Sequence, residues 1–327
     1  MFPFLSSLGR PVVPADEAFA NTGFPATALP VADEVSASGH IELVPLASDH
    51  LNSLAHLQAD CWQQPVDAAH LLEDLNDAGR AAGKNVVVAL RGGEVVACGA
   101  WVTLDLARTG QFFMAPLFGH DAAALQSVVD HILSVAIAEG ATSVRVSARQ
   151  TEPIKTALLT ALGFVPRFEW VFFSRANLLG LPQALPAGWV RESYEQVDWL
   201  LLAEDFAEMF AHVPNCTLPP ADVLRQDWRD RDWEGSWVLR DPNGRYGALA
   251  LLRDGWVEPV GVRPEWRGLG LAEVLYQRLA QSLDQRGRMP LRAMVASSNL
   301  PSMRLHQRLG FIEDAPRSQM MELGLRR

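Results

Sequence analysis

Hydrophobic and polar positions alternate along the chain with two periods, and their order predicts a mixed α/β fold. Residues 40–46, HIELVPL, alternate as a strand does, and residues 47–62 then carry Leu51, Leu54 and Leu57 at helical spacing. The rest of the first half predicts a helix, a hairpin, a strand, a helix, a strand, a helix and a strand, at residues 66–83, 85–104, 111–118, 121–140, 142–148, 152–164 and 168–176.

The second half repeats this order. It predicts a strand, two helices, a hairpin, a strand, a helix, a strand, a helix and a strand, at residues 188–193, 194–213, 219–235, 236–255, 256–262, 271–287, 291–297, 302–311 and 318–325. Each hairpin carries a turn signal, Gly92-Gly93 in the first half and Asn243-Gly244 in the second. The segments 158–164 and 305–311 both end a helix on Leu-Gly-Phe, where glycine suits the left-handed position after the last turn.

These parallels predict an internal repeat of one domain, with a single large domain as the weaker alternative. Residues 1–38 are rich in Pro, Ala and Ser and show no sustained period, so we expect an N-terminal tail or docking arm. The two copies are predicted to span residues 39–178 and 179–327. The segment 178–188, with its prolines and glycines, is the predicted linker.

The composition is that of a globular protein with two ordinary domains. The 327 residues are 49% hydrophobic and 20% charged, which provides enough apolar material for sizeable cores. A formal net charge of -10 argues against a nucleic-acid partner, because phosphate contact needs a positive face. The sequence contains neither a membrane-spanning apolar run nor the pattern of a signal peptide. Because Cys61, Cys98 and Cys216 lie far apart, we expect a cytoplasmic protein without disulfides or a metal site.

The segment 262–272, VRPEWRGLGLA, places an arginine and two glycines where an apolar strand gives way to a helix. Such junctions bind phosphate, because the first N–H groups of the helix are free and glycine lets the backbone approach the anion. A Walker A loop would need Gly-Lys-Ser/Thr, and a dinucleotide fingerprint would need glycine in place of Glu273. What remains is Arg-x-x-Gly-x-Ala, formed by Arg267, Gly270 and Ala272, with a chance glycine turn as the alternative.

With the elements around it, this pattern resembles the GNAT superfamily of acyl-CoA-dependent N-acyltransferases. In that family an Arg/Gln-x-x-Gly-x-Gly/Ala loop holds the pyrophosphate of coenzyme A. The resemblance covers residues 188–327 and includes a second motif, SSNLPSMRLHQRLGF, in which the family's pantetheine-contacting asparagine matches Asn299. It implies two tandem GNAT-like domains, each a mixed, mostly antiparallel sheet flanked by helices, with acetyl-CoA as co-substrate and no metal. The cofactor-binding residues it implies are Val262, Arg263, Arg267, Gly268, Leu269, Gly270, Leu271, Ala272, Asn299 and Ser302.

The resemblance also implies where the chemistry takes place. In the family the pantetheine arm enters between the splayed fourth and fifth strands, and backbone groups near Val262 would polarise the thioester carbonyl. Pro259 fits a bulge or splayed edge there, although a plain kink explains it equally well. Many members carry a general-acid tyrosine where this chain has His306, which would donate the proton or merely line the channel. Glu258 is the candidate base, because its side chain should share a face with Val260 and Val262; a solvated strand residue and a water relay are the alternatives.

The first half resembles the family much more weakly. At the position of the loop it reads APLFGHDAAAL, where Pro116 would match Pro264 and Gly119 remains, but no arginine follows. Few freed N–H groups and no cation would hold a pyrophosphate poorly. Residues 39–178 are therefore expected to be a degenerate copy with a structural or substrate-shaping role. Tandem family members with a degenerate first copy and an active second copy have a similar plan.

The implied reaction transfers an acetyl group to a primary amine, on a small molecule, a peptide N-terminus or a lysine. In the family the first two helices bind the acceptor, here residues 204–234, where acids with Trp228 and Trp233 would receive a cation unless they form a solvated polar face. A non-catalytic acyl-CoA-binding regulatory protein is the alternative function, and a protein-interaction scaffold that binds no coenzyme A is a third. The acyl length beyond acetyl and the oligomeric state stay open.

Overall fold

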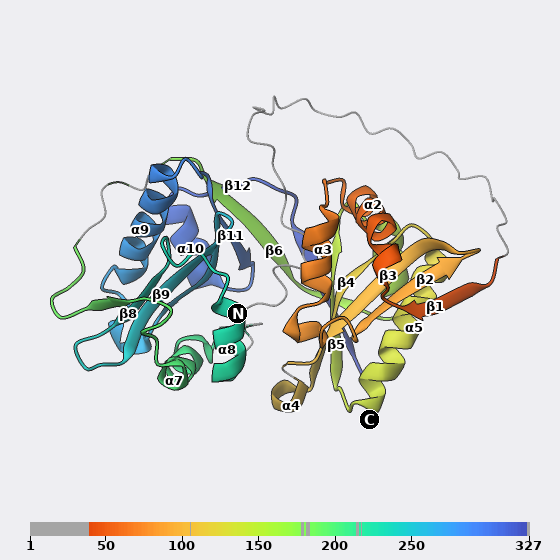
Figure 1. The fold of residues 1–327 in the computed structure, drawn as a ribbon, viewed down its shortest axis with the longest axis horizontal. Helices are drawn as coiled ribbons and strands as arrows, with labels where there is room; N and C mark the ends of the chain where they lie inside the picture. The colour runs from red at the N-terminus through yellow and green to blue at the C-terminus, as the bar shows by residue number, and fades with distance from the viewer. Residues whose placement is uncertain are drawn as a thin grey trace.

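The computed structural model describes residues 39–104, 106–177, 180, 184–213, 216 and 218–325. The predicted tail at 1–38 and part of the predicted linker at 178–188 lie outside these residues. The described chain forms two lobes around one continuous sheet, and strand β6 (Val165–Arg175) runs between the lobes (Figure 1).

The two halves contain the predicted elements in the predicted order. The elements of the first half are β1 (Ile41–Pro45), the 3-10 helix η1 (Ser48–His50), α2 (Leu51–Trp62), α3 (Ala68–Leu75), η2 (Ala78–Arg80), β2 (Val86–Arg91), β3 (Glu94–Val102), α4 (Leu106–Thr109), β4 (Gln111–Gly119), α5 (Ala122–Ala138), β5 (Ser143–Arg149), α6 (Pro153–Ala161) and β6. Those of the second half are β7 (Val190–Glu192), α7 (Trp199–Phe210), α8 (Ala221–Trp228), β8 (Trp237–Arg240), β9 (Tyr246–Arg253), β10 (Trp256–Val262), η3 (Pro264–Trp266), α9 (Leu271–Gln285), β11 (Leu291–Ala296), α10 (Leu300–Arg308), β12 (Ile312–Glu313) and β13 (Ser318–Gly324).

Local chemistry sets several of the boundaries that differ from the prediction. The helix expected to begin at residue 194 begins at Trp199, because the Asp198 side chain accepts a hydrogen bond from the Leu201 N–H and caps it. The helix expected over 66–83 ends at Leu75 and is followed by η2. Both hairpin turns form as predicted, and the short strand β12 was not predicted.

The strands form a single sheet in which the last strand of each half is exchanged. The order is β1-β2-β3-β4-β5-β13-β6-β11-β10-β9-β8-β7, with β12 also paired to β6. β13, from the end of the chain, therefore lies between β5 and β6, and β6 lies against β11 of the second half. The fold is a tandem repeat, but each half borders a strand from the other. The boundary between 178 and 179 stays a prediction.

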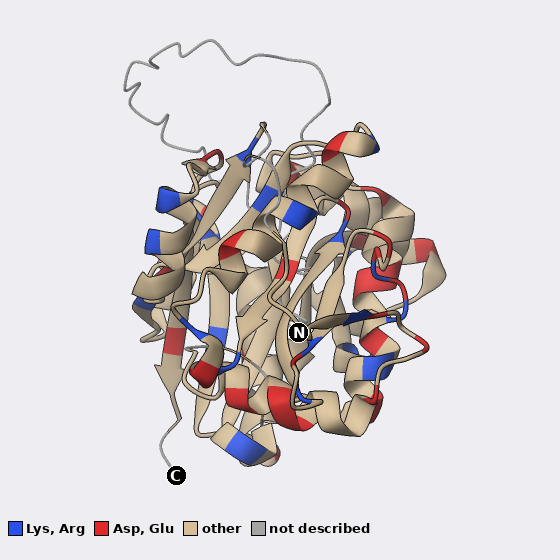
Figure 2. Ribbon diagram, turned by 90° about the vertical axis from the view of Figure 1, so that its left-hand side faces the viewer, with Lys and Arg blue, Asp and Glu red and all other residues tan. Residues whose placement is uncertain are grey.

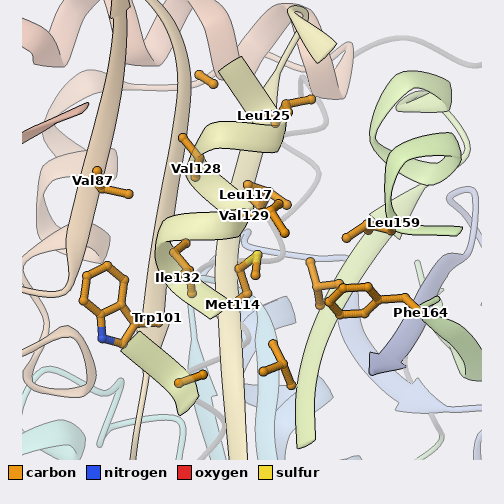
Figure 3. Close-up of a cluster of buried hydrophobic side chains, with 14 of the residues drawn as sticks. Val87, Trp101, Met114, Leu117, Leu125, Val128, Val129, Ile132, Leu159 and Phe164 are labelled. Atoms are coloured by element: carbon orange, nitrogen blue, oxygen red, sulfur yellow. The ribbon is translucent and has the colours of Figure 1, made fainter. Parts of the chain in front are cut away.

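Among the apolar clusters of the described residues, three show how the halves are built and joined. Helix α5 covers the first half, where Leu125, Val128 and Ile132 pack against the strands (Figure 3). Helix α9 covers the second half with residues such as Leu275 and Leu279. A third cluster joins the halves, and it contains Phe113, Phe168, Trp170, Phe172, Trp256 and Met320. The side chains of β6 thus pack on both halves at once.

A proline interrupts the fourth strand of each half. Pro116 lies in β4 and Pro259 in β10, and the pairing register shifts by one residue beside each of them. Proline cannot donate a ladder hydrogen bond, so it is accommodated at a bulge. The bulge expected at Pro259 is confirmed. The expected match of Pro116 with Pro264 is wrong, because the equal positions of the two bulges align Pro116 with Pro259.

Charged residues lie mostly on the outer helices and loops, and few mark the central strands (Figure 2). No described helix is both long and apolar enough to cross a bilayer. Within the same residues, no three His, Cys, Asp or Glu side chains gather as metal ligands would.

Candidate active site

The two central strands of the second half separate after a short paired segment. β10 and β11 pair only at Trp256–Arg292 and Val257–Ala293, although both strands continue beyond these positions. A cavity of about 640 Å³ lies in the gap. Helices α9 and α10 contribute Tyr276, Leu305 and His306 to its lining from one face of the sheet. From the other face, the end of α7 contributes Met209 and Phe210, and β11 contributes Met294.

The ladder between β9 and β10 directs backbone groups into this gap. The Arg263 N–H donates to the Gly247 carbonyl at 2.9 Å, so the preceding residue, Val262, belongs to a non-hydrogen-bonded pair. The N–H and C=O groups of Val262, and by the same alternation those of Val260, therefore point away from β9. The Val262 carbonyl accepts a hydrogen bond from Arg267 Nε at 3.1 Å. The Val262 N–H is thus a donor directed toward the cavity.

A glycine loop leads from β10 to the N-terminus of α9. Gly268 and Gly270 have positive φ values of 81° and 78°, and no atom lies within 4 Å of where a side chain would start. Gly270 is the N-cap, so no side chain caps this helix. Leu271 is buried in the core, whereas Leu269 is exposed. The first N–H groups of α9 are therefore held in place and open to an anion.

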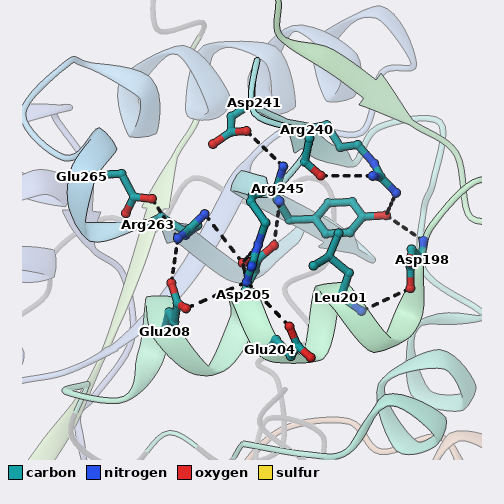
Figure 4. A network of polar contacts seen from close by, with 12 residues as sticks. Asp198, Leu201, Glu204, Asp205, Glu208, Arg240, Asp241, Arg245, Arg263 and Glu265 are labelled. Carbon is teal, nitrogen blue, oxygen red and sulfur yellow. Dashed lines mark hydrogen bonds and ion pairs between the residues drawn. The ribbon is translucent and has the colours of Figure 1, made fainter.

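The two arginines of this segment have different surroundings. Arg267 lines the cavity and donates through Nη2 to the Met209 carbonyl at 2.9 Å, which ties the loop to the end of α7. Arg263 lies in an ion-pair network, with Glu208 at 2.8 Å and Glu265 at 2.9 Å (Figure 4). It is not among the residues that line the cavity. Of the two predicted cofactor contacts, the structure brings only Arg267 to the cavity.

The second motif also reaches the cavity. Asn299 is the N-cap of α10, and Ser302 and His306 lie on this helix. All three line the gap, together with Ala272 from the first turn of α9. The Asn299 side chain accepts from the Ser302 N–H at 3.3 Å and caps the helix. The Asn299 side-chain oxygen therefore already accepts one hydrogen bond, and the side-chain NH2 group is the part that can contact a ligand.

His306 is held in one neutral tautomer. Nδ1 lies 2.8 Å from the Ser302 carbonyl, which can only accept, so Nδ1 carries the proton. Nε2 therefore accepts the hydrogen bond from the Tyr276 hydroxyl at 2.7 Å. Burial disfavours the imidazolium and lowers the His306 pKa to about 4, and burial also raises the Tyr276 pKa. Phe173 stacks on the imidazole at 5.3 Å. At neutral pH the imidazole is an acceptor with no acidic proton to donate into the cavity.

Glu258 does not face the cavity. The bulge at Pro259 adds one residue to β10, so Val257, Val260 and Val262 share a face and Glu258 lies on the opposite one. The expectation that Glu258 shares a face with Val260 and Val262 is therefore wrong. Its carboxylate is buried and lies 2.7 Å from Arg231, in an ion pair that is itself buried. A carboxylate held in this way is a poor candidate for the base.

The first half lacks the glycine loop altogether. β4 ends at Gly119 and α5 begins at Ala122, whereas eight residues separate β10 from α9. Asp121 is the N-cap of α5, and its carboxylate accepts from the Ala124 N–H at 2.9 Å and pairs with Arg91. The N-terminus that would bind a phosphate is thus occupied by a carboxylate of the chain.

The gap of the first half is also filled. Lys155 Nζ donates to the Leu117 carbonyl at 2.8 Å and to Glu152 at 2.6 Å, and all of these atoms are buried. Leu117 follows Pro116 as Val260 follows Pro259, so the ammonium occupies the position that is open in the second half. The remaining cavity measures about 10 Å³. The described residues of the first half therefore form neither an anion cradle nor a channel.

Most of the acidic side chains of the predicted acceptor region are paired. Asp205 lies 2.8 Å from Arg245 (Figure 4), and Asp232 lies 2.6 Å from Arg286. Trp228 is fully buried in the core under α7 and α8. The acids and indoles of 204–234 thus build the domain and do not form an open cage for a cation.

The lining residues that sequence reasoning missed include Tyr276 and Trp170. Tyr276 lies thirty positions before its partner His306, and no local pattern brings the two together. Trp170 belongs to the first half and reaches the cavity because β6 is exchanged next to β11. The only available signal for Tyr276 was its rarity, since the chain has 3 tyrosines. For Trp170 there was none.

Comparisons with known proteins agree with this geometry. Residues 199–311 match the family model for the acetyltransferase (GNAT) family. Among curated proteins, none matches the chain significantly in sequence.

Similar folds occur among solved structures. A GCN5-related N-acetyltransferase from Sphaerobacter thermophilus is 18% identical, with a TM-score of 0.68 over 88% of this chain and 96% of that one. A tandem GNAT protein from the clavulanic acid biosynthesis pathway is 17% identical, with a TM-score of 0.65 over 87% and 98%. A glucosamine N-acetyltransferase region of a fungal multi-domain β-N-acetylglucosaminidase is 15% identical, with a TM-score of 0.66 over 90% and 40%. The chain therefore has a tandem GNAT fold, and its residues 199–311 match the model of the acetyltransferase (GNAT) family.

Proposed function

We propose that the second half transfers an acetyl group from acetyl-CoA to an amine in the cavity between β10 and β11. One observation carries this proposal: the gap that holds the Val262 N–H lies next to a glycine loop and an uncapped helix N-terminus. In acetyl-CoA the pantetheine arm joins a thioester to a pyrophosphate, so one molecule would use both features, with the arm in the gap between the strands.

The residues present fit acetyl-CoA. The open space at Gly268 and Gly270 lets a pyrophosphate approach the backbone, and the dipole of α9 favours its charge. When bound, acetyl-CoA supplies an acetyl group activated as a thioester. The Val262 N–H would polarise the thioester carbonyl, and Arg267 would fix that donor by holding the Val262 carbonyl.

Chain residues contribute little to proton transfer in this proposal. The amine nitrogen forms a bond to the carbonyl carbon, the carbon–sulfur bond breaks, and one proton passes from the nitrogen to the sulfur. Glu258 lies on the wrong face and His306 is neutral, so neither is assigned this proton. The Tyr276 oxygen retains lone pairs beside the cavity, because its hydrogen is committed to His306. It is suited to orient the amine as a hydrogen-bond acceptor.

A thiol-release assay tests the proposal. The protein is incubated with acetyl-CoA and a panel of primary amines, and free coenzyme A is followed with a thiol reagent. We expect amine-dependent release that falls at least tenfold in Arg267→Ala, since that variant loses the support of the Val262 carbonyl. Arg278→Ala, which alters an arginine of α9 that does not line the cavity, is the control.

The committed hydrogen bonds of His306 favour one rival, a regulatory protein that binds acetyl-CoA without turnover. Calorimetry with acetyl-CoA separates the two functions. Binding without thiol release on any amine would support the regulatory function, and absence of both would support a scaffold that uses no coenzyme A.

A further inference from the structure

The cavity between β10 and β11 meets solvent at the end of α7 as well as at the glycine loop. The described lining residues that are exposed are Arg267, Ser298, Pro301 and His212. The first three lie in the glycine loop or beside the start of α10, where coenzyme A would bind. His212 follows α7, across the sheet from α9 and α10. An acceptor amine would therefore reach the thioester past His212.

The turn that carries His212 is held against β10. The Val213 N–H donates to the Phe210 carbonyl at 2.9 Å and closes the turn. Gly261 lets the end of α7 approach the strand, because a side chain at Gly261 would begin 2.7 Å from the Phe210 ring. The next residue is Val262, whose N–H points into the cavity. His212 thus belongs to a turn that packs beside the position proposed for the thioester.

The interior of the cavity offers no negative group to a cation. No carboxylate occurs among the lining residues that the structure describes. The acids Glu208 on α7 and Glu258 on β10 are paired with Arg263 (Figure 4) and Arg231. An alkyl amine at neutral pH is mostly an ammonium ion, since its pKa resembles that of lysine, about 10.4. It must therefore lose a proton before it enters, and the neutral form is also the nucleophile.

The described lining residues with ionisable side chains are Arg267, Tyr276, His306 and His212. Arg267 stays protonated, and burial raises the Tyr276 pKa. Burial lowers the His306 pKa to about 4, and both of its ring nitrogens are hydrogen-bonded. His212 is exposed and has no hydrogen-bond or ion-pair partner among the described residues. Because histidine changes charge between about pH 5 and pH 8, His212 is the lining side chain suited to accept this proton.

The charged groups on the elements around His212 leave it free to exchange protons. Glu208, one turn earlier on α7, is paired with Arg263, and Arg267 is held by backbone carbonyls. The lining of the same cavity by β6 and β11 is neutral and includes Trp170. A proton on the exposed imidazole is therefore not trapped by a bound carboxylate and can pass to solvent.

We propose that His212 is a catalytic base that takes the proton of the incoming ammonium ion at the rim of the cavity. One N–H bond of the ammonium breaks, its electron pair stays on the nitrogen, and an N–H bond forms on the imidazole, which returns the proton to solvent. The proton that later passes from nitrogen to sulfur is a second one. This inference rests on the function proposed above and adds a residue that neither sequence motif contains.

A pH profile of thiol release tests this assignment, with benzylamine as the acceptor and kcat/KM expressed per total amine. If His212 deprotonates the ammonium ion, the wild-type kcat/KM should rise between about pH 5 and pH 8 and then stay level up to pH 9. His212→Gln can use only the free amine, so its kcat/KM should be at least tenfold lower at pH 7 and should still rise about tenfold per pH unit up to pH 9.

Two controls separate proton uptake from a structural effect. His56→Gln alters an exposed histidine of α2 that does not line the cavity, and it should keep the wild-type profile. The affinity of His212→Gln for acetyl-CoA, measured by calorimetry, should equal that of the wild type. If His212→Gln keeps the wild-type profile, or if the wild type itself follows the free amine up to pH 9, the inference is wrong while acetyl transfer stands. If no amine releases coenzyme A, the proposed function fails and this inference fails with it.

Discussion

His306 owes its properties to two hydrogen bonds and to burial. The Ser302 carbonyl fixes the proton on Nδ1, Tyr276 donates to Nε2, and the ring is 2% exposed. A charged ring would reverse the Tyr276 bond, because Nε2 would then donate to the hydroxyl oxygen and the hydroxyl hydrogen would lose its acceptor. The site thus keeps the imidazole neutral at the position where many family members carry a general acid.

The neutral state has a consequence for stability. The His306 pKa is about 4 in the folded protein and near 6.5 when unfolded, so between these values only the unfolded chain takes up the proton. The free energy of unfolding should therefore fall as the pH drops through this window, and above pH 6.5 the group contributes no change. The pKa difference corresponds to about 3 kcal/mol. The glutamine of His306→Gln cannot titrate, so this variant escapes the loss. Between pH 7 and pH 4 its free energy of unfolding should rise relative to that of the wild type by up to about 3 kcal/mol.

Urea unfolding at pH 7, 5.5 and 4 measures this difference. His212→Gln, which alters an exposed histidine at the rim, is the control and should follow the wild type. If the free energy of unfolding changes with pH equally in His306→Gln and in the wild type, the fold does not keep the imidazole neutral.

Gly270 keeps the N-terminus of α9 open, and a carboxylate at this position should close it. In Gly270→Asp the carboxylate would stand at the N-terminus of α9 and would repel a pyrophosphate. We expect the affinity for coenzyme A to fall at least tenfold by calorimetry. Gly140→Asp is a matched control, because Gly140 has the same φ of 78° and equally open space. It should lose comparable stability and keep full affinity.

At the scale of elements, one strand-to-helix connection distinguishes the halves. β10 reaches α9 through an eight-residue loop, whereas two residues join β4 to α5. The short connection leaves no backbone to surround a phosphate, and Lys155 closes the gap behind it. The junction between the fourth strand and the following helix is thus open in the second half and closed in the first.

This difference predicts one coenzyme A site per chain. Titration calorimetry should give a stoichiometry of one, because the helix that follows the fourth strand is uncapped in the second half and capped by Asp121 in the first. Asp121→Ala should leave both the stoichiometry and the affinity unchanged and destabilise the protein by about 1 kcal/mol through the lost cap. Two sites per chain would contradict the closed state of the first half.

The sequence pattern predicts each element better than the relations between elements. Strands and helices follow from period and caps, and the glycine loop follows from its composition. The sheet face on which Glu258 lies does not follow from the sequence. Pro259 indicates a bulge, but the alternation of side chains between the two faces shifts by one residue there, and the sequence does not show this shift. Tyr276 and Trp170 were missed because their positions at the cavity depend on contacts between distant segments. Local rules cannot supply such contacts.

At the scale of the whole molecule, the exchanged strands make the halves interdependent. β6 covers the open edge of β11, and β13 fills the place between β5 and β6. Without β6 the second half would expose a sheet edge beside the cavity and lose Trp170 from its wall. The linear boundary at 178/179 would separate each strand from its partners.

Dividing the chain at that boundary tests this interdependence. We expect residues 179–327 alone to be insoluble or unfolded by circular dichroism, because β11 loses β6 and β13 loses both of its neighbours. Residues 1–178 should also be insoluble or unfolded, because β5 and β6 lose β13. Co-expression of the two pieces should restore a soluble complex that binds coenzyme A, since every strand then regains its partners.

A fragment 163–327, which keeps β6, is the control and should be more soluble than 179–327. If 179–327 alone folds cooperatively and binds coenzyme A with the affinity of the full chain, the exchange is not needed for the site, and the first half is dispensable for binding.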